Sequence, residues 1–459
     1  MINKILLIYL FIFVNIVSSQ EIITKYLLEN GDTLDVFSYQ IPQNYDSLNN
    51  HALLVAFHQW GGNQNTTYST QFDEEADALN WFYLSPYGGS SNNYNHQGAQ
   101  YFIQQEILWL MDNYSINNER IYFVGGSMGG AAGAIYANNH LDPTKPMVAA
   151  TASASGILDC ERRAIEMNGN NSMIEWFGGN WDEVPFEYHR NSAVYFADST
   201  QSMHYNLQYI PLYLDFGEVE PHREHAEDLF DLLLNYNENM WIDENPIGSH
   251  GFPVIDEHHA CEWLSQFELI DNPDFINVNL DEPSRAYWLE ALNQHFTEQF
   301  IRIVSSRDPD RIYISEFDNS DSLLIYLSDI YINDLTIIIE NVPIFTLGIT
   351  AEWFGNLSQV ELTNEDGNID CIYINTDTLW FDCLEMGEYN FWFSYDSECG
   401  SNLGNVNGDE NIDILDLVQI SFYILGISIP NFECSADFNG DDSVNILDLV
   451  QIANYILDN

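Results

Sequence analysis

Basic residues are scarce in this sequence. Only 12 Lys and Arg stand against 70 Asp and Glu among 459 residues, which gives a formal net charge of −58 at pH 7. A chain this acidic repels the phosphates of nucleic acids and the headgroups of anionic lipids at ordinary salt. We therefore expect neither a nucleic acid nor a membrane surface among its partners. Solubility or a salty habitat explains most of the acidity.

Metal-binding cysteine motifs are also missing. The sequence has no Cys-x-x-Cys pair and no Cys/His cluster, so its cysteines do not indicate a zinc site. The six cysteines are an even number, which is common in exported proteins with disulfides. Cys160 with Cys261 and Cys371 with Cys383 are candidate pairs, and the sequence alone does not fix the pairing.

After the N-terminus, no apolar run resembles a membrane span. Residues 1–19 contain Lys4, then an apolar run from Ile5 to Val17, and end in small residues. This is the layout of a cleaved secretory signal peptide, and the run is short for a membrane anchor. We expect cleavage after Ser19 and a mature protein that is secreted or attached to the cell surface, without a membrane span.

Three folded regions are expected after the signal peptide. From 20 to 270, apolar runs alternate with helical stretches, which predicts an α/β fold with a sheet covered by helices on both faces. From 271 to 400, β-branched and aromatic runs separated by Asn, Asp and Gly predict a β-sandwich-like domain. From 401 to 459 the sequence repeats with a period of 32 residues, which predicts a small duplicated unit. In the first region we expect strands at 51–57, 121–124, 147–152 and 210–214, and helices at 100–114, 130–138 and 257–267.

Ser127 is the candidate nucleophile. It lies in the sequence Gly-Gly-Ser-Met-Gly, between a predicted strand and an Ala-rich predicted helix. Gly-x-Ser-x-Gly in this context is typical of a nucleophile elbow, in which small neighbours allow the strained turn that exposes the serine Oγ.

The serine needs a base. His250 follows the last expected strand and precedes the expected terminal helix. This position favours it over His258 and His259, which lie inside that helix.

The acid that orients the base should follow the strand at 210–214. Glu220 has the expected spacing after Gly217, and Glu218 and Asp215 are close enough to serve instead. The sequence leaves this choice open.

Backbone N–H groups must hold the oxyanion of the reaction intermediate. Met128, directly after the serine, supplies one amide. The loop after the strand at 51–57 supplies the second, from Trp60 or from neighbouring Gln59. We interpret His58 as a residue that shapes this loop.

Three segments of the first region resemble secreted esterases of the polyhydroxybutyrate-depolymerase and feruloyl or acetylxylan esterase kind, which are related to prolyl-oligopeptidase-type hydrolases. They are residues 54–63 (LVAFHQWGGN), 119–130 (ERIYFVGGSMGG) and 248–252 (GSHGF). The resemblance covers about residues 30–270 and implies an α/β-hydrolase that attacks esters through an acyl-enzyme, with no catalytic cofactor. Two features depart from the family: His-Gly becomes His58-Gln59, and the acid, usually Asp, would be Glu if Glu220 or Glu218 takes that role.

The repeated tail resembles the two EF-hand-type calcium loops of a dockerin module. Loop positions 1, 3, 5, 7, 9 and 12 supply the oxygen ligands in such loops. In the first loop these positions hold Asn405, Asn407, Asp409, Asn411, Asp413 and Asp416, and in the second Asp437, Asn439, Asp441, Ser443, Asn445 and Asp448. Position 6, usually Gly, is Glu410 or Asp442, and the first loop begins with Asn, so we expect it to bind calcium more weakly.

A dockerin implies a cohesin-like partner or a cell-surface scaffold. The positions where recognition residues usually lie hold Ile414-Leu415 and Ile446-Leu447, which are apolar. We therefore expect a secreted serine esterase that acts on an ester-bearing polysaccharide or polymer and is tethered through its tail. The alternatives are a secreted serine peptidase of prolyl-oligopeptidase type and a calcium-dependent adhesion or scaffold protein whose hydrolase domain has decayed.

Overall fold

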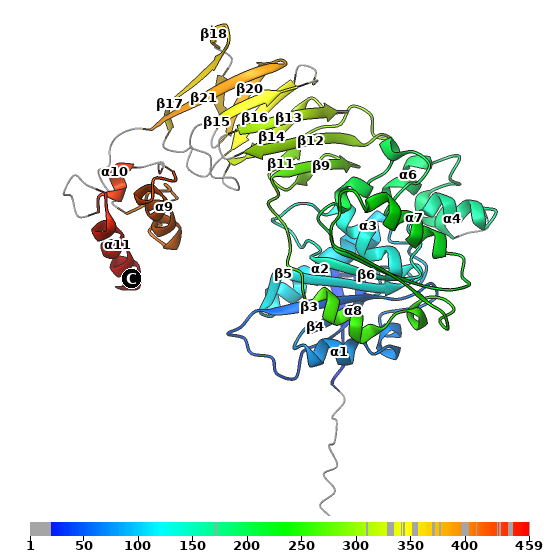
Figure 1. Ribbon diagram of the computed structural model, residues 1–459. Coiled ribbons are helices and arrows are strands. Elements are labelled where there is room, and N and C mark those ends of the chain that lie inside the picture. Colours follow the sequence, from blue (N-terminus) through cyan, green and yellow to red (C-terminus); the bar gives the residue numbers. More distant parts are fainter. Residues whose placement is uncertain are drawn as a thin grey trace, which may run out of the picture.

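The computed structural model describes residues 20–169, 172–308, 311–327, 335–340, 342, 345–350, 357–369, 372–375, 378–395, 404–409, 411–428, 430, 433–438 and 444–458. They form an α/β unit, a unit of two sheets and a small helical unit, in that order along the chain (Figure 1). The predicted signal peptide lies outside the described residues. Within these ranges, no helix has the length and apolar character needed to cross a membrane.

An eight-stranded sheet forms the centre of the α/β unit. Its order is β1-β2-β4-β3-β5-β6-β7-β8, in which β1 and β2 are antiparallel and the pairs from β4 to β8 are parallel. This arrangement, with the sharp turn after β5 described below, is that of an α/β-hydrolase. The strands are β1 (Ile23–Glu29), β2 (Asp32–Gln40), β3 (His51–Phe57), β4 (Phe82–Pro86), β5 (Ile116–Gly126), β6 (Ala150–Ala154), β7 (Leu212–Gly217) and β8 (Met240–Asn245).

Helices cover both faces of this sheet, because its central strands are apolar on both sides. In β3, Leu53 and Val55 pack with α2, α3 and α7, whereas Leu54 and Ala56 pack with α1 and α8. The helices are α1 (Phe72–Ala78), α2 (Gln97–Asn113), α3 (Ala132–Asn139), α4 (Cys160–Glu166), α5 (Met173–Phe177), α6 (Pro185–Arg190), α7 (Arg223–Leu233) and α8 (Glu257–Leu264). Short 3-10 turns lie at Thr66–Ser69, Gly129–Ala131, Ser199–Gln201, His204–Leu207 and Phe252–Val254.

The expected elements occur with shifted ends. The strand expected at 210–214 begins at Leu212, because Pro211 has no N–H to donate to a neighbouring strand. It continues to Gly217, so Asp215 lies inside the sheet. The strand expected at 147–152 begins at Ala150, where pairing with Tyr122 starts.

The disulfide between Cys160 and Cys261 was a wrong prediction. Both cysteines are free and buried. Cys160 begins α4 and packs with Tyr94 and Met128, whereas Cys261 lies on α8 in the core of the opposite sheet face. Two cysteines can form a disulfide only when their Cα atoms are close, and these belong to different cores. The side chains of the other candidate pair, 371 and 383, lie outside the described residues.

Two sheets form the second unit, as the sequence predicted. Their orders are β10-β11-β14-β16-β20-β19 and β18-β17-β21-β15-β13-β12-β9, and their inner faces share one apolar core. The strands are β9 (Phe275–Leu280), β10 (Arg285–Ala286), β11 (Leu289–Ala291), β12 (Ile301–Asp308), β13 (Arg311–Asp318), β14 (Ser322–Tyr326), β15 (Leu335–Ile339), β16 (Phe345–Thr350), β17 (Leu357–Asn364), β18 (Gly367–Asn368), β19 (Ile372–Asn375), β20 (Thr378–Leu384) and β21 (Gly387–Tyr395).

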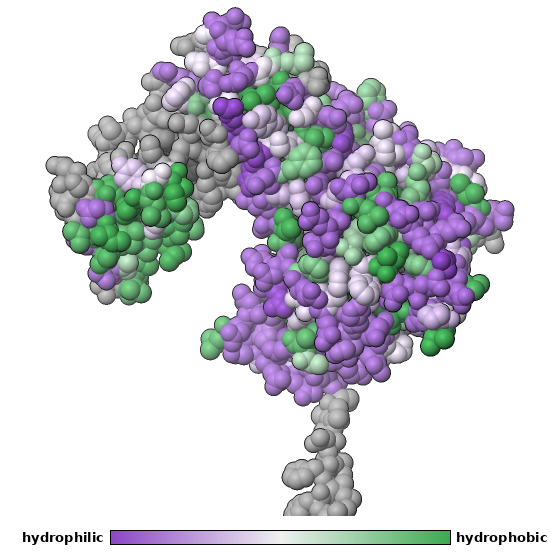
Figure 2. Space-filling model, viewed as in Figure 1, coloured by the Kyte–Doolittle hydropathy of each residue, from purple (hydrophilic) through white to green (hydrophobic). Residues whose placement is uncertain are grey.

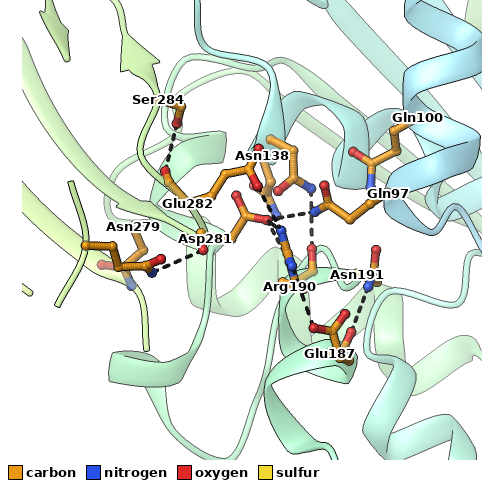
Figure 3. A network of polar contacts seen from close by, with 12 residues as sticks. Gln97, Gln100, Asn138, Glu187, Arg190, Asn191, Asn279, Asp281, Glu282 and Ser284 are labelled. Carbon is orange, nitrogen blue, oxygen red and sulfur yellow. Dashed lines mark hydrogen bonds and ion pairs between the residues drawn. The ribbon is translucent and has the colours of Figure 1, made fainter. Parts of the chain in front are cut away.

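A partly buried polar network joins the α/β unit to the two-sheet unit (Figure 3). The Arg190 guanidinium donates from Nε to Asp281 Oδ2 at 2.7 Å, and Gln97 Nε2 donates to the same oxygen at 2.7 Å. Asn206 exchanges two hydrogen bonds of 2.9 Å with the backbone of Asn279. The two units therefore pack against each other through specific contacts.

The helical unit consists of α9 (Ile414–Ile424), α10 (Glu433–Ala436) and α11 (Ile446–Asp458). A small core of Val406, Ile420, Ala436 and Ile452 holds it together. The side chain of Asp413 accepts a hydrogen bond from Leu415 N at 2.8 Å and so caps the start of α9.

Candidate active site

Ser127 sits on a strained turn between β5 and the short helical turn at Gly129–Ala131. Its φ is 56°, a left-handed conformation that costs a non-glycine residue energy. The turn packs closely against the end of β3: a Cβ on Gly129 would lie 2.6 Å from the carbonyl oxygens of Phe57 and His58. Only glycine fits there, so the loop after β3 is held beside the serine.

Ser127, His250 and Glu220 form a continuous chain of hydrogen bonds. Ser127 Oγ lies 2.8 Å from His250 Nε2, and His250 Nδ1 lies 2.7 Å from Glu220 Oε2. The His250 side chain is 38% exposed, and that of Glu220 is fully buried. A buried carboxylate on Nδ1 keeps the proton on that nitrogen and leaves Nε2 free to accept the serine proton.

The other candidates lie elsewhere. Asp215 is buried within β7, where burial and nearby Asp243 raise its pKa to about 7. Glu218 is exposed. His258 is exposed and pairs with Glu75, and His259 Nδ1 lies 2.9 Å from the Tyr213 hydroxyl.

The loop after β3 is shaped by His58. Its Nδ1 lies 2.8 Å from Gln59 O, its Nε2 lies 3.0 Å from Tyr87 O, and the ring is buried. Trp60, in the same loop, is 59% exposed and donates from Nε1 to Ser172 Oγ at 3.1 Å. On the other side of the serine, Met128 is buried, and its carbonyl accepts a hydrogen bond from Asn95 Nδ2 at 3.0 Å. Met128, directly after the serine, and Trp60, in the loop after β3, are thus each held by a hydrogen bond.

Sequence reasoning missed two residues that hold the histidine loop. Ser155 Oγ accepts a hydrogen bond from Gly251 N at 2.9 Å. The Gln59 side chain fills the space over Gly251, where a Cβ would lie 1.6 Å from Gln59 Nε2. The departure from His-Gly to His58-Gln59 was the one available signal for Gln59, because the added amide fills a gap that glycine leaves open.

The first repeated loop ends in a buried carboxylate, that of Asp416. Asp416 accepts hydrogen bonds from Val406 N at 2.7 Å and from Asp413 N at 2.9 Å. Burial raises the pKa of Asp416, and nearby Asp409 raises it further. No Lys, Arg or His follows Arg311 in the sequence to balance these charges. A bound cation with oxygen ligands fits this loop, because it would balance the carboxylate charges.

The second loop ends in the same way as the first. Asp448 is buried and accepts a hydrogen bond from Asn445 N at 2.9 Å, which matches the contact between Asp416 and Asp413 N. Asn439, Asp441 and Ser443 lie outside the described residues.

Residues 403–457 match the family model of the dockerin type I domain. The tail is a type I dockerin. Domains of this family bind calcium and interact with cohesins in general. In this dockerin, the apolar pairs Ile414-Leu415 and Ile446-Leu447 are exposed, and Figure 2 shows a largely hydrophobic surface on the helical unit.

Solved structures align with the α/β unit at low identity. An acetyl xylan esterase from Aspergillus awamori is 13% identical, with 53% of this chain and 98% of that chain covered and a TM-score of 0.38. A fluorophosphonate-binding serine hydrolase of Staphylococcus aureus is 14% identical, with 53% and 98% covered and a TM-score of 0.40. A feruloyl esterase module from Clostridium thermocellum is 15% identical, with 54% and 88% covered and a TM-score of 0.38. A search of curated protein sequences finds no significant match.

Proposed function

We propose that this chain is a secreted serine esterase that hydrolyses carboxylic esters on a polysaccharide or polymer and is tethered by its dockerin. The observation that carries the proposal is the chain of hydrogen bonds from Ser127 through His250 to buried Glu220. A serine on a strained elbow, a base within reach and a buried acid together make an activated nucleophile.

In the proposed reaction, Ser127 Oγ attacks the ester carbonyl carbon as His250 Nε2 takes its proton. The oxyanion that forms is held by the backbone amides of Met128 and Trp60. His250 then gives its proton to the departing alcohol, which leaves an acyl-enzyme. Water, deprotonated by His250, attacks this acyl group and releases the acid and the free serine. Glu220 stabilises the charged imidazole throughout and keeps its own proton state unchanged.

Calcium has a structural role in this proposal. The ligands are the oxygens of the two dockerin loops named above, with Asp416 and Asp448 at the last position of each loop. Calcium balances the buried carboxylates and so holds α9 and α11 in their folded arrangement. Type I dockerins occur in extracellular cellulosome components, which supports a secreted enzyme held near an insoluble polysaccharide.

Two other functions are the alternatives to this proposal. A serine peptidase would use the same three side chains, and a decayed hydrolase would have lost them. The intact hydrogen-bond chain counts against decay.

The test is a panel of substrates offered to the full-length protein with calcium present. We expect hydrolysis of p-nitrophenyl acetate and of feruloyl or acetyl esters of polysaccharides, and no cleavage of peptides. Ser127→Ala should abolish the activity while the protein stays folded. Cleavage of peptides but not esters would assign the peptidase function instead.

A further inference from the structure

A third polar side chain lies beside the base and the acid. The ligand atoms of Glu220, His222 and His250 all lie within 4.8 Å of one another. His222 is 2% exposed, and the Glu220 side chain is fully buried. The cluster therefore sits below the active-site surface, and the half-exposed His250 ring is the side of it that faces solvent.

Two atoms of this cluster have no hydrogen-bond partner. They are His222 Nε2 and Glu220 Oε1, and both are buried. His222 Nδ1 lies 2.8 Å from the carbonyl oxygen of Ser155, so it carries the ring proton and Nε2 carries a lone pair. Within this cluster, two buried acceptor atoms thus lack a hydrogen-bond donor. Burying such acceptors without a partner is unfavourable, which a cation would relieve.

The ligand set indicates which cation fits. Two imidazole nitrogens and one carboxylate form a three-ligand set that suits zinc, with a fourth position left open. Zinc bonds of about 2.0–2.2 Å place tetrahedral ligands roughly 3.3–3.5 Å apart. The 2.7 Å contact between His250 Nδ1 and Glu220 Oε2 would lengthen by roughly 0.7 Å, and the ligand atoms farthest apart, within 4.8 Å, would approach each other by at most about 1.4 Å. Calcium prefers oxygen ligands and does not compete well for this set.

Zinc at this place would stop the proposed reaction. Binding at Nδ1 of His250 requires the lone pair there, so the proton of the neutral ring moves to Nε2. An Nε2 that already holds a proton cannot accept one from Ser127. The ring proton is relocated and not lost, so no other reactant is needed.

We propose that Glu220, His222 and His250 form an inhibitory zinc site that switches off the hydrolase by fixing the wrong tautomer of His250. Its inhibitory effect rests on the proposed function, whereas metal binding itself does not. His222 takes no part in the proposed reaction. It provides the third metal ligand, which an ordinary triad does not have.

The first test follows the labelling of Ser127 by a fluorophosphonate probe in the full-length protein, with calcium fixed so that the dockerin stays loaded. Zinc should slow labelling of the wild type reversibly. His222→Asn keeps an amide N–H where Nδ1 donates to Ser155 and removes Nε2. We expect it to label at the wild-type rate and to need at least about 100-fold more zinc for the same inhibition. His258→Asn is the matched control, because His258 is an exposed histidine beside Glu75 and Glu262, and its zinc response should equal that of the wild type.

The second test reads metal binding directly and does not depend on activity. Cobalt(II) added to the wild type should give the strong visible absorption of a tetrahedral site with nitrogen ligands, which the oxygen ligands of the dockerin do not produce. Glu220→Gln and His222→Asn should each remove it. Equal zinc inhibition of His222→Asn and wild type, or no tetrahedral cobalt signal in the wild type, would overturn the zinc site. A cobalt signal without any labelling of the wild type would retain the metal site and refute the proposed function.

Discussion

Replacing Glu220 with glutamine should disable the enzyme without unfolding it. The carboxylate lies 2.7 Å from His250 Nδ1 and is fully buried, so it acts on the ring at short range with little screening by solvent. Glutamine has nearly the same shape. Its amide N–H can donate to Nδ1 and thereby favour the tautomer whose Nε2 holds the proton.

The expected loss follows from the role of the acid. Amide substitution of the acid in a serine triad lowers kcat by about 10³- to 10⁴-fold, because the ring is held in the wrong tautomer and its positive charge is not stabilised. This loss corresponds to about 4 to 5.5 kcal/mol in the activation barrier. KM should change little, because Glu220 does not touch the substrate.

The assay is hydrolysis of p-nitrophenyl acetate by Glu220→Gln, with thermal melting as a check of folding. Glu218→Gln is the matched control: it removes an exposed carboxylate two residues away and should keep activity within about twofold, as is usual for a surface substitution. Asp215→Asn tests the buried alternative, which lies within β7, whereas the carboxylate that contacts His250 Nδ1 is that of Glu220. If Glu220→Gln kept a tenth or more of the activity while either other variant lost a thousandfold, the assignment of the acid would be wrong.

Three further predictions concern stability. Burial raises the pKa of Glu106, and Asp35 beside it raises that pKa further, so the folded protein binds a proton that the unfolded chain loses above about pH 4.3. The free energy of unfolding should therefore fall as the pH rises above that value, and Glu106→Gln should reduce this dependence in urea titrations at several pH values. Removing calcium with a chelator should lower the unfolding free energy of the dockerin by about 2.7 kcal/mol if the metal was present at a hundred times its Kd. The melting temperature should fall accordingly. Asp416→Asn should melt at the calcium-free temperature in a calorimetric scan, and a dockerin transition that ignores calcium would refute the assignment of the loops. Asp281→Asn should remove the shortest ion pair of partly buried Arg190, which keeps Glu187 and Glu282 at 3.6 Å, and lower the unfolding free energy by about 1.5–3 kcal/mol, measured by chemical denaturation.

Much of the fold could be predicted from local sequence. The run from His51 to Phe57 is apolar at every position but its first, and it forms a strand buried on both faces. The glycines around Ser127 predicted the sharp turn, because few other residues permit it. In the tail, the repeat predicted a duplicated unit, and the two copies of its repeated segment form α9 and α11.

Contacts between distant segments were harder to predict. The choice among three acids depended on where β7 ends, and its extension to Gly217 puts Asp215 inside the sheet. His222 lies two residues from Glu220, but its approach to His250 depends on how two loops meet. The Cys160–Cys261 pair failed for the same reason, since spacing along the chain does not reveal which face of the sheet a helix covers.

The most direct test of the account is the stoichiometry and place of fluorophosphonate labelling on the full-length protein, measured by intact mass and peptide mapping. We expect one adduct per chain on Ser127, no adduct on folded Ser127→Ala, and much slower labelling of His250→Ala. A folded wild type that takes up no probe, or a Ser127→Ala variant labelled as fully as the wild type, would contradict the claim that Ser127 is the activated nucleophile.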